Sequence, residues 1–169
     1  MSKVPQVPPY MGDFSDEDMA WAYAVGEKRQ VRPGEAIIHE GQPVRDLYIV
    51  LKGAFVVTSR KRDMSEVHQL GPGEIVGEMS YVSKQLPYSS VRAATESVVF
   101  RIPLTALDQK IAADPGFAAR FHKVVSQFTV ARLLEWGPPR PEPQPSEASG
   151  DASLRVHELI ERMLRGEFP

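Results

Sequence analysis

Short apolar runs separated by turn glycines occupy residues 28–103, and they restrict the possible folds more than any other feature. The runs are rich in β-branched and aromatic residues, as half-buried strands are, and they recur at roughly 8–12 residue intervals. The clearest lie at 36–39, 47–51, 54–58 and 97–102. About eight such strands suit a mainly β fold with flanking helices. We therefore predict an eight-stranded jelly roll, or double-stranded β-helix.

Glycines lie at the ends of these runs, where the chain must turn. A turn needs either a positive φ angle or a backbone without Cβ, and glycine provides both. Five stretches follow this pattern: 33–35, 40–41, 51–53, 71–74 and 76–80.

The stretch around Gly77 and Glu78 carries the most chemistry. A Gly-Glu pair that opens a short helical turn, followed here by Met79 and Ser80, offers backbone N–H groups to an anion beside one carboxylate. This arrangement suits a sugar-phosphate, provided that a cation completes the site.

Helical patterns flank the β region on both sides. Ser15 followed by acidic residues predicts a helix start, and Gly26 predicts its end. We expect its inward face to carry Met19, Ala20, Tyr23 and Ala24. After the β region, we predict a helix over 104–112 and a longer one from Asp114 to about Trp136.

The long predicted helix has apolar residues nearly all round. One seam repeats at steps of four and three residues and consists of Phe117, Phe121, Val124, Phe128 and Ala131. A second edge consists of Val125, Val130, Leu133 and Leu134. Because a helix that is apolar nearly all round needs burial on two sides, we expect residues 117–136 both to cover the barrel and to form a homodimer contact.

The remaining segments complete the predicted organisation. Residues 1–14 read as an irregular arm, 15–136 as the folded domain, 137–151 as a Pro-rich flexible linker and 152–169 as a C-terminal amphipathic helix. A helix that short must dock on something to persist. Residues 152–165 could dock on their own barrel, on a dimer mate or in the groove of another protein.

Composition and motif spacing argue against several classes of protein. A net charge of −2 argues against a DNA-binding surface, and no apolar run reaches the ~20 residues that span a bilayer. The absence of cysteine fits a reducing compartment, so we expect a cytoplasmic protein. The four histidines are scattered without metal-ligand spacing, and Ser89-Ser90 has no nearby base. We therefore expect no metal site and no enzyme activity.

Residues 15–136 resemble the cyclic nucleotide-binding domain found in the catabolite activator protein and in protein kinase A regulatory subunits. The glycine string, the Gly77-Glu78 loop, the Val91-Arg92-Ala93 run after it and the long terminal helix carry this resemblance. It is most similar to stand-alone bacterial forms that have no DNA-binding domain.

The resemblance implies a phosphate-binding cassette for cAMP or cGMP. In it, the Glu78 carboxylate would accept a hydrogen bond from the ribose hydroxyl. The backbone N–H groups of Gly77, Met79 and Ser80 would donate hydrogen bonds to the cyclic phosphate. The family places an arginine against that phosphate, but its position falls here on Pro87 or, with a one-residue shift, on Tyr88. Ser89 and Ser90 take the other aligned cassette positions. Lys84 is the candidate substitute cation, and Phe128 and Trp136 are the candidate base-capping residues.

Loss of the arginine changes the expected affinity. A charge-assisted contact contributes roughly 1.5–3 kcal/mol, and about 3–5 kcal/mol if its loss leaves a buried charge unpaired. Because each 1.4 kcal/mol is about tenfold in affinity, nucleotide binding should be about ten- to a thousandfold weaker than in the family's usual mode. Two hypotheses follow. The first is a non-catalytic sensor with weak or altered ligand binding, and the second is a ligand-free dimeric adaptor that uses its long helix and C-terminal helix.

Overall fold

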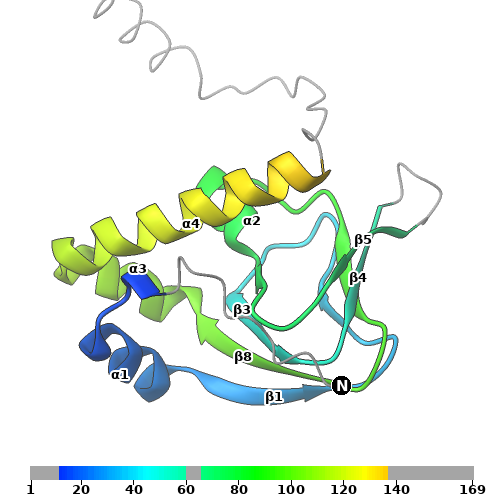
Figure 1. Cartoon of the computed structure of the whole chain (residues 1–169), viewed down its shortest axis with the longest axis horizontal. Helices are drawn as coiled ribbons and strands as arrows, with labels where there is room; N and C mark the ends of the chain where they lie inside the picture. Colours follow the sequence, from blue (N-terminus) through cyan, green and yellow to red (C-terminus); the bar gives the residue numbers. More distant parts are fainter. Residues whose placement is uncertain (1–11, 60–65, 137–169) are drawn as a thin grey trace, which may run out of the picture. The chain divides into compact units, whose positions relative to one another are not determined.

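The computed structural model describes residues 12–59 and 66–136, and for residues 66, 67, 135 and 136 it describes the backbone alone. The elements are α1 (Asp16–Val25), β1 (Glu27–Val31), β2 (Ala36–Ile38), β3 (Asp46–Lys52), β4 (Phe55–Thr58), β5 (Glu66–Leu70), β6 (Ile75–Val76), α2 (Glu78–Ser83), β7 (Ser90–Ala93), β8 (Ser97–Pro103), α3 (Leu104–Ala113) and α4 (Pro115–Trp136). Figure 1 shows α4 running across one side of the barrel, with α2 beside it.

The strands form two four-stranded antiparallel sheets. One has the order β1-β8-β3-β6 and the other the order β2-β7-β4-β5. Neighbours within a sheet come from distant parts of the chain: Leu47 of β3 lies opposite Ile102 of β8, and Val56 of β4 lies opposite Arg92 of β7. This architecture confirms the predicted eight-stranded jelly roll with flanking helices.

Two cores form on the two faces of the β1-β8-β3-β6 sheet. Successive side chains on a strand point to opposite faces, and β8 shows this directly: Val99 joins the core inside the barrel, while Phe100 and Ile102 join the core under the helices. The side chains of strand β3 alternate in the same way: Tyr48 joins the core inside the barrel, and Leu47 joins the core under the helices. The helices therefore cover the outer face of this sheet.

The turn glycines adopt the backbone conformation predicted for them. Positive φ angles occur at Gly34, Gly41, Gly53, Gly73 and Gly77. At Gly53 an added Cβ would also lie 2.2 Å from Ser97 Oγ, so this turn excludes any side chain.

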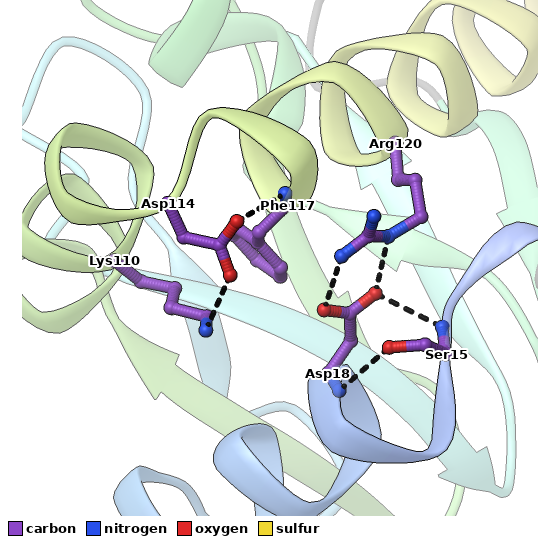
Figure 2. A network of polar contacts seen from close by, with 6 residues as sticks. All are labelled: Ser15, Asp18, Lys110, Asp114, Phe117 and Arg120. Atoms are coloured by element: carbon purple, nitrogen blue, oxygen red, sulfur yellow. Dashed lines mark hydrogen bonds and ion pairs between the residues drawn. The ribbon is translucent and has the colours of Figure 1, made fainter.

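Helix α1 begins as predicted but turns a different face inward. Ser15 caps it, because its Oγ accepts from the Asp18 N–H while the Asp18 carboxylate accepts from the Ser15 N–H (Figure 2). The prediction that Met19, Ala20, Tyr23 and Ala24 face inward is wrong, because all four are exposed. The packed residues are Trp21, Ala22 and Val25, beside buried Asp18. The reason is that Asp18 pairs with Arg120 of α4, which rotates the helix about this anchor.

Helix α4 starts at the predicted Asp114-Pro115 junction and covers the sheet with its first four turns. Asp114 Oδ1 accepts from the Phe117 N–H at 2.9 Å and so caps the helix. The seam of Phe117, Phe121, Val124 and Phe128 is buried, whereas Ala131 is exposed. On the second edge Val125 is buried, while Val130 and Leu134 remain exposed.

Several predicted segments lie outside the described residues. These are most of the N-terminal arm (residues 1–11), the linker at 137–151 and the helix at 152–169. None of the helices within residues 12–59 and 66–136 combines the length and apolar character that crossing a membrane requires.

Candidate functional site

Gly77 connects the end of β6 to helix α2, and the fold requires glycine there. Its φ is +99°, which L side chains rarely adopt. An added Cβ would lie 3.1 Å from the Asp46 carbonyl oxygen and 3.3 Å from Val44 Cγ1. The close approach of this backbone directs Glu78, the first residue of α2, into the interior.

The Glu78 carboxylate is paired with a guanidinium from the long helix. Only 1% of Glu78 is exposed, and its Oε1 accepts from Arg132 Nη1 at 2.5 Å. Arg132, which is 8% exposed, also donates from Nη2 to Glu74 Oε2 at 2.9 Å and to the Ile75 carbonyl at 2.7 Å. One guanidinium thus joins α4, α2 and the chain before β6.

Burial and charge act in opposite directions on Glu78. Burial is the larger influence and raises the pKa of the Glu78 carboxyl, while the Arg132 guanidinium and the N–H groups of Glu78 and Met79 act to lower it. A carboxylate this deep in the protein is costly without a cation, so Arg132 stabilises its charged form.

The other residues of α2 are arranged around this pair. Met79 is exposed and Ser80 is half-buried. Tyr81 is buried, and its hydroxyl donates to Asp108 Oδ1 of α3 at 2.7 Å. Burial, followed by the bond to Asp108, raises the pKa of Tyr81. This contact ties α2 to the helical side of the domain.

The residues at the predicted arginine position pack against the turn after β2. The Pro87 carbonyl accepts from the Gly41 N–H at 2.9 Å, and Ser90 Oγ accepts from the Glu40 N–H at 2.9 Å. The Tyr88 carbonyl accepts from Ser59 Oγ at 3.3 Å. Tyr88 itself is exposed, and its hydroxyl donates to Gln85. Ser89 is half-buried.

The candidate cation Lys84 and the nearby Arg92 both contact other groups. Lys84 ends α2 in a left-handed conformation, with φ of 57°, and its Nζ lies 4.2 Å from the centre of the Tyr81 ring. Arg92 Nη1 donates to the carbonyl of Gly34, in the turn between β1 and β2, at 3.3 Å. The structure thus places neither beside Glu78.

The two proposed base-capping residues lie on α4. Phe128 is buried in the helical core, with the Arg132 guanidinium 4.3 Å from its ring centre. Trp136 ends the helix, and its side chain lies outside the described part.

Sequence reasoning missed Arg132, although the pattern held a signal. Phe121, Val125, Phe128 and Arg132 follow one another at steps of four, three and four, so all four share a face of α4. The first three are buried apolar residues. A charged residue that continues such a face needs a buried partner of opposite charge, and Glu78 is that partner.

A polar cavity of about 240 Å³ lies next to the Gly77 backbone. Ile38, Val44 and Asp46 line it and also surround the Gly77 backbone. None of residues 78–90 contributes to its lining. Within the part of the chain that the structure describes, no three metal-ligating side chains gather.

Two antiparallel four-stranded sheets, a buried Gly-Glu turn and a long covering helix define a jelly-roll domain. The chain belongs to the cyclic nucleotide-binding domain family, whose model matches residues 28–114, more than half of its 169 residues.

The chain is also similar to individual proteins. The chain is similar to an NTE family protein of Mycobacterium tuberculosis, with 25% identity over 107 residues, which is 63% of this chain and 18% of that protein. Among solved structures, a cyclic nucleotide-binding domain of Methylobacillus flagellatus has the same fold, with a TM-score of 0.67, 22% identity and coverage of 72% of this chain and 70% of that one. The regulatory subunit of a cAMP-independent protein kinase A from Trypanosoma brucei gives a TM-score of 0.54 at 20% identity, covering 70% and 46%. The chain spans less than a fifth of the length of the first curated relatives it matches.

Proposed function

We propose that this domain is a non-catalytic regulatory module whose cyclic nucleotide pocket binds cAMP or cGMP weakly. The observation that carries the proposal is the contact of Glu78 Oε1 with Arg132 Nη1 at 2.5 Å, because it takes up one oxygen of the carboxylate that would accept a hydrogen bond from a ribose hydroxyl. Pro87 adds to the effect, since it has no charged group and no backbone N–H to offer a phosphate.

Family membership supports the regulatory class but does not require a response to cAMP. The structural relative from Trypanosoma brucei is described as part of a cAMP-independent kinase. Independence of cAMP therefore has a parallel among proteins of this fold. The proposal places the module in the cytoplasm, because a chain without cysteine suits a reducing compartment.

Calorimetric titration of cAMP and cGMP into the wild-type chain and into Pro87→Arg tests the pocket. We expect wild-type binding about ten- to a thousandfold weaker than that of Pro87→Arg, since one bidentate charged contact contributes roughly 1.5–3 kcal/mol, and about 3–5 kcal/mol where its absence leaves a buried charge unpaired. Leu86→Arg is the matched control, because it adds the same charge at an exposed neighbouring position. Glu78→Ala should abolish the binding gained by Pro87→Arg. Equal affinity of all variants would contradict the proposal.

A second function, a dimeric protein adaptor, is favoured by the exposed apolar edge of α4. Val130 is 54% exposed and Leu134 is 83% exposed, and they lie one turn apart on the same face. Light scattering of the double variant Val130→Asp, Leu134→Asp tests this contact, with Ala20→Asp on α1 as the charge control. The adaptor hypothesis predicts that the wild-type chain and Ala20→Asp are dimers and that the double variant is a monomer.

The proposed protein partner of residues 152–165 concerns residues outside the described part. Truncation after Gly137, followed by affinity capture with the full chain as reference, tests it. Identical partners for both forms would remove this contact from the proposal.

A further inference from the structure

An apolar cavity of about 520 Å³ lies against the outer face of the β1-β8-β3-β6 sheet, beside α1 and α4. Phe100 of β8 pairs across the strands with Ile49 of β3, so both side chains share this face, and both line the cavity. Leu51 follows two residues further along β3 and also lines it. Ile49 is half-buried and Leu51 is 40% exposed, so the helices cover this part of the face incompletely.

The lining of the cavity is suited to an apolar occupant. Among the described residues that line it, only Asp18 and Lys28 carry charge, and Arg120 already pairs with Asp18. Water that entered the cavity would find few polar partners, and apolar side chains that face a void lose their dispersion contacts. A group that fills the cavity with apolar atoms would therefore stabilise the domain.

The described part of the chain begins at this cavity. Gly12 and Phe14 both line it. The Phe14 ring stacks on Phe117 of α4, with ring centres 6.2 Å apart. The Asp13 carboxylate pairs with Lys123 Nζ of the same helix at 3.1 Å. These contacts fix the attachment point of the eleven residues before Gly12, which are therefore tethered at the edge of the cavity.

The sequence of residues 4–11 fits such a cavity. Seven of the eight are apolar or proline, and Gln6 is the exception. Val4, Val7 and Tyr10 recur at steps of three, the repeat of a polyproline II helix, which would place them on one face. The prolines have no backbone N–H that burial could leave unpaired. At about 3.1 Å per residue the segment would reach ~25 Å, more than the ~14 Å across a four-stranded sheet.

We propose that residues 4–11 fill the cavity of their own chain, with Val4, Val7 and Tyr10 against the exposed apolar side of β3. A tethered segment acts at an effective concentration on the order of millimolar, which favours it over a free apolar molecule. The proposal does not depend on nucleotide binding, because none of residues 76–99 lines the cavity. The N-terminal segment then completes the cover of the sheet.

Disulfide trapping in the full chain tests the location of the segment. The chain has no cysteine, so an engineered pair supplies the only two thiols. Val7→Cys is combined with Leu51→Cys in the cavity or, as the matched control, with Val82→Cys, another exposed apolar position, on α2 and outside the lining. Val4→Cys and Tyr10→Cys repeat the comparison for the rest of the face. We expect disulfides to Leu51→Cys to form at least tenfold faster than those to Val82→Cys. Equal rates at all three positions would overturn the proposal, and so would crosslinked dimers in place of monomers, because the segment would then fill the cavity of a second copy.

Binding of the apolar dye 1-anilinonaphthalene-8-sulfonate tests whether the segment keeps the cavity closed. The double variant Val4→Asp, Val7→Asp is compared with the wild-type chain and with the charge-matched control Ser2→Asp, Gln6→Asp. A carboxylate cannot be buried unpaired among apolar side chains, so the double variant should leave the cavity open. We expect it to bind the dye at least tenfold more tightly than the other two chains.

Trp21 fluorescence identifies where the dye binds. Trp21 lines the cavity and, with Trp136→Phe in every chain, is the only tryptophan. Quenching of Trp21 in the double variant alone would support the proposal. Equal dye binding by all three chains, or none by any, would overturn it; in the first case, quenching of Trp21 would show that the cavity takes free apolar ligands. If circular dichroism shows that the double variant does not fold, the disulfide rates still decide.

Discussion

Arg120 on α4 faces Asp18 on α1 with two of its three guanidinium nitrogens in hydrogen-bond range of the carboxylate (Figure 2). Nε lies 2.6 Å from Oδ2, and Nη2 lies 2.8 Å from Oδ1. The residues are 102 positions apart, so this pair joins the two ends of the domain. The same Asp18 closes the capping box with Ser15, and one carboxylate therefore fixes both the start of α1 and its rotation against α4.

Asp18→Asn should reduce stability in a pH-dependent way. The hydrogen bond from Arg120 is the main cause that holds the pKa of Asp18 at about 2, below its ordinary value of 3.8. Because the folded pKa is the lower one, the carboxylate stabilises fully above pH 3.8, and this contribution is lost as the pH falls through about 2. Since Arg120 is partly exposed, we expect a loss of roughly 1–2 kcal/mol at pH 6. Urea unfolding at several pH values measures it, and a difference that stays constant from pH 6 to pH 2 would contradict the assignment.

Gly77→Ala should destabilise the domain more than Gly34→Ala. Both glycines have positive φ, but only the Gly77 backbone has atoms close to an added Cβ. The left-handed conformation costs a non-glycine residue about 1–2 kcal/mol, and crowding against Asp46 and Val44 adds to it at position 77 alone. Urea unfolding of the two variants separates the effects, and equal losses would show that crowding is unimportant.

Val124→Ala and Val130→Ala compare the two sides of α4. Val124 is 0% exposed in the helical core, whereas Val130 is 54% exposed. Removing two buried methyl groups should cost about 2 kcal/mol, while the exposed change should be near neutral because alanine favours helix. A large loss in Val130→Ala, measured by urea unfolding at high dilution, would instead show that position 130 is covered in solution.

Tyr81→Phe should lower stability by about 1 kcal/mol, since it removes a hydrogen bond to Asp108 from a buried side chain. Tyr88→Phe is the control, because the Tyr88 hydroxyl donates to Gln85 at an exposed position and its loss should cost almost nothing. Thermal unfolding of both variants checks the difference. Equal melting temperatures for the two variants would show that the contact between α2 and α3 contributes nothing.

Local patterns predicted most of the fold. Ser15 and Gly26 marked the ends of α1 correctly, because capping depends on residues within one helical turn. The turn conformation at the glycines could likewise be predicted from the residues next to them in the sequence. The inward face of α1 could not be predicted in this way, because a residue 102 positions further along the chain decides the rotation of the helix.

The candidate site also combines a feature that the local sequence predicts with one that it does not. The Gly77-Glu78 turn was visible in the sequence, and the structure confirms the backbone conformation that it requires at Gly77. The cation beside it was sought within the same loop, at Lys84, because an aligned motif offers only positions close in sequence. Folding supplied Arg132 instead, 54 residues away from Glu78.

Taken alone, the amino-acid sequence determined the two-sheet roll, the helix boundaries and the positive φ angles of the turn glycines, because each depends on periodicity or on contacts within a few residues. Only the tertiary structure decided which charge meets Glu78. The physical reason is that a buried carboxylate takes whichever cation the packing of distant helices brings within about 3 Å, and no local pattern encodes that distance.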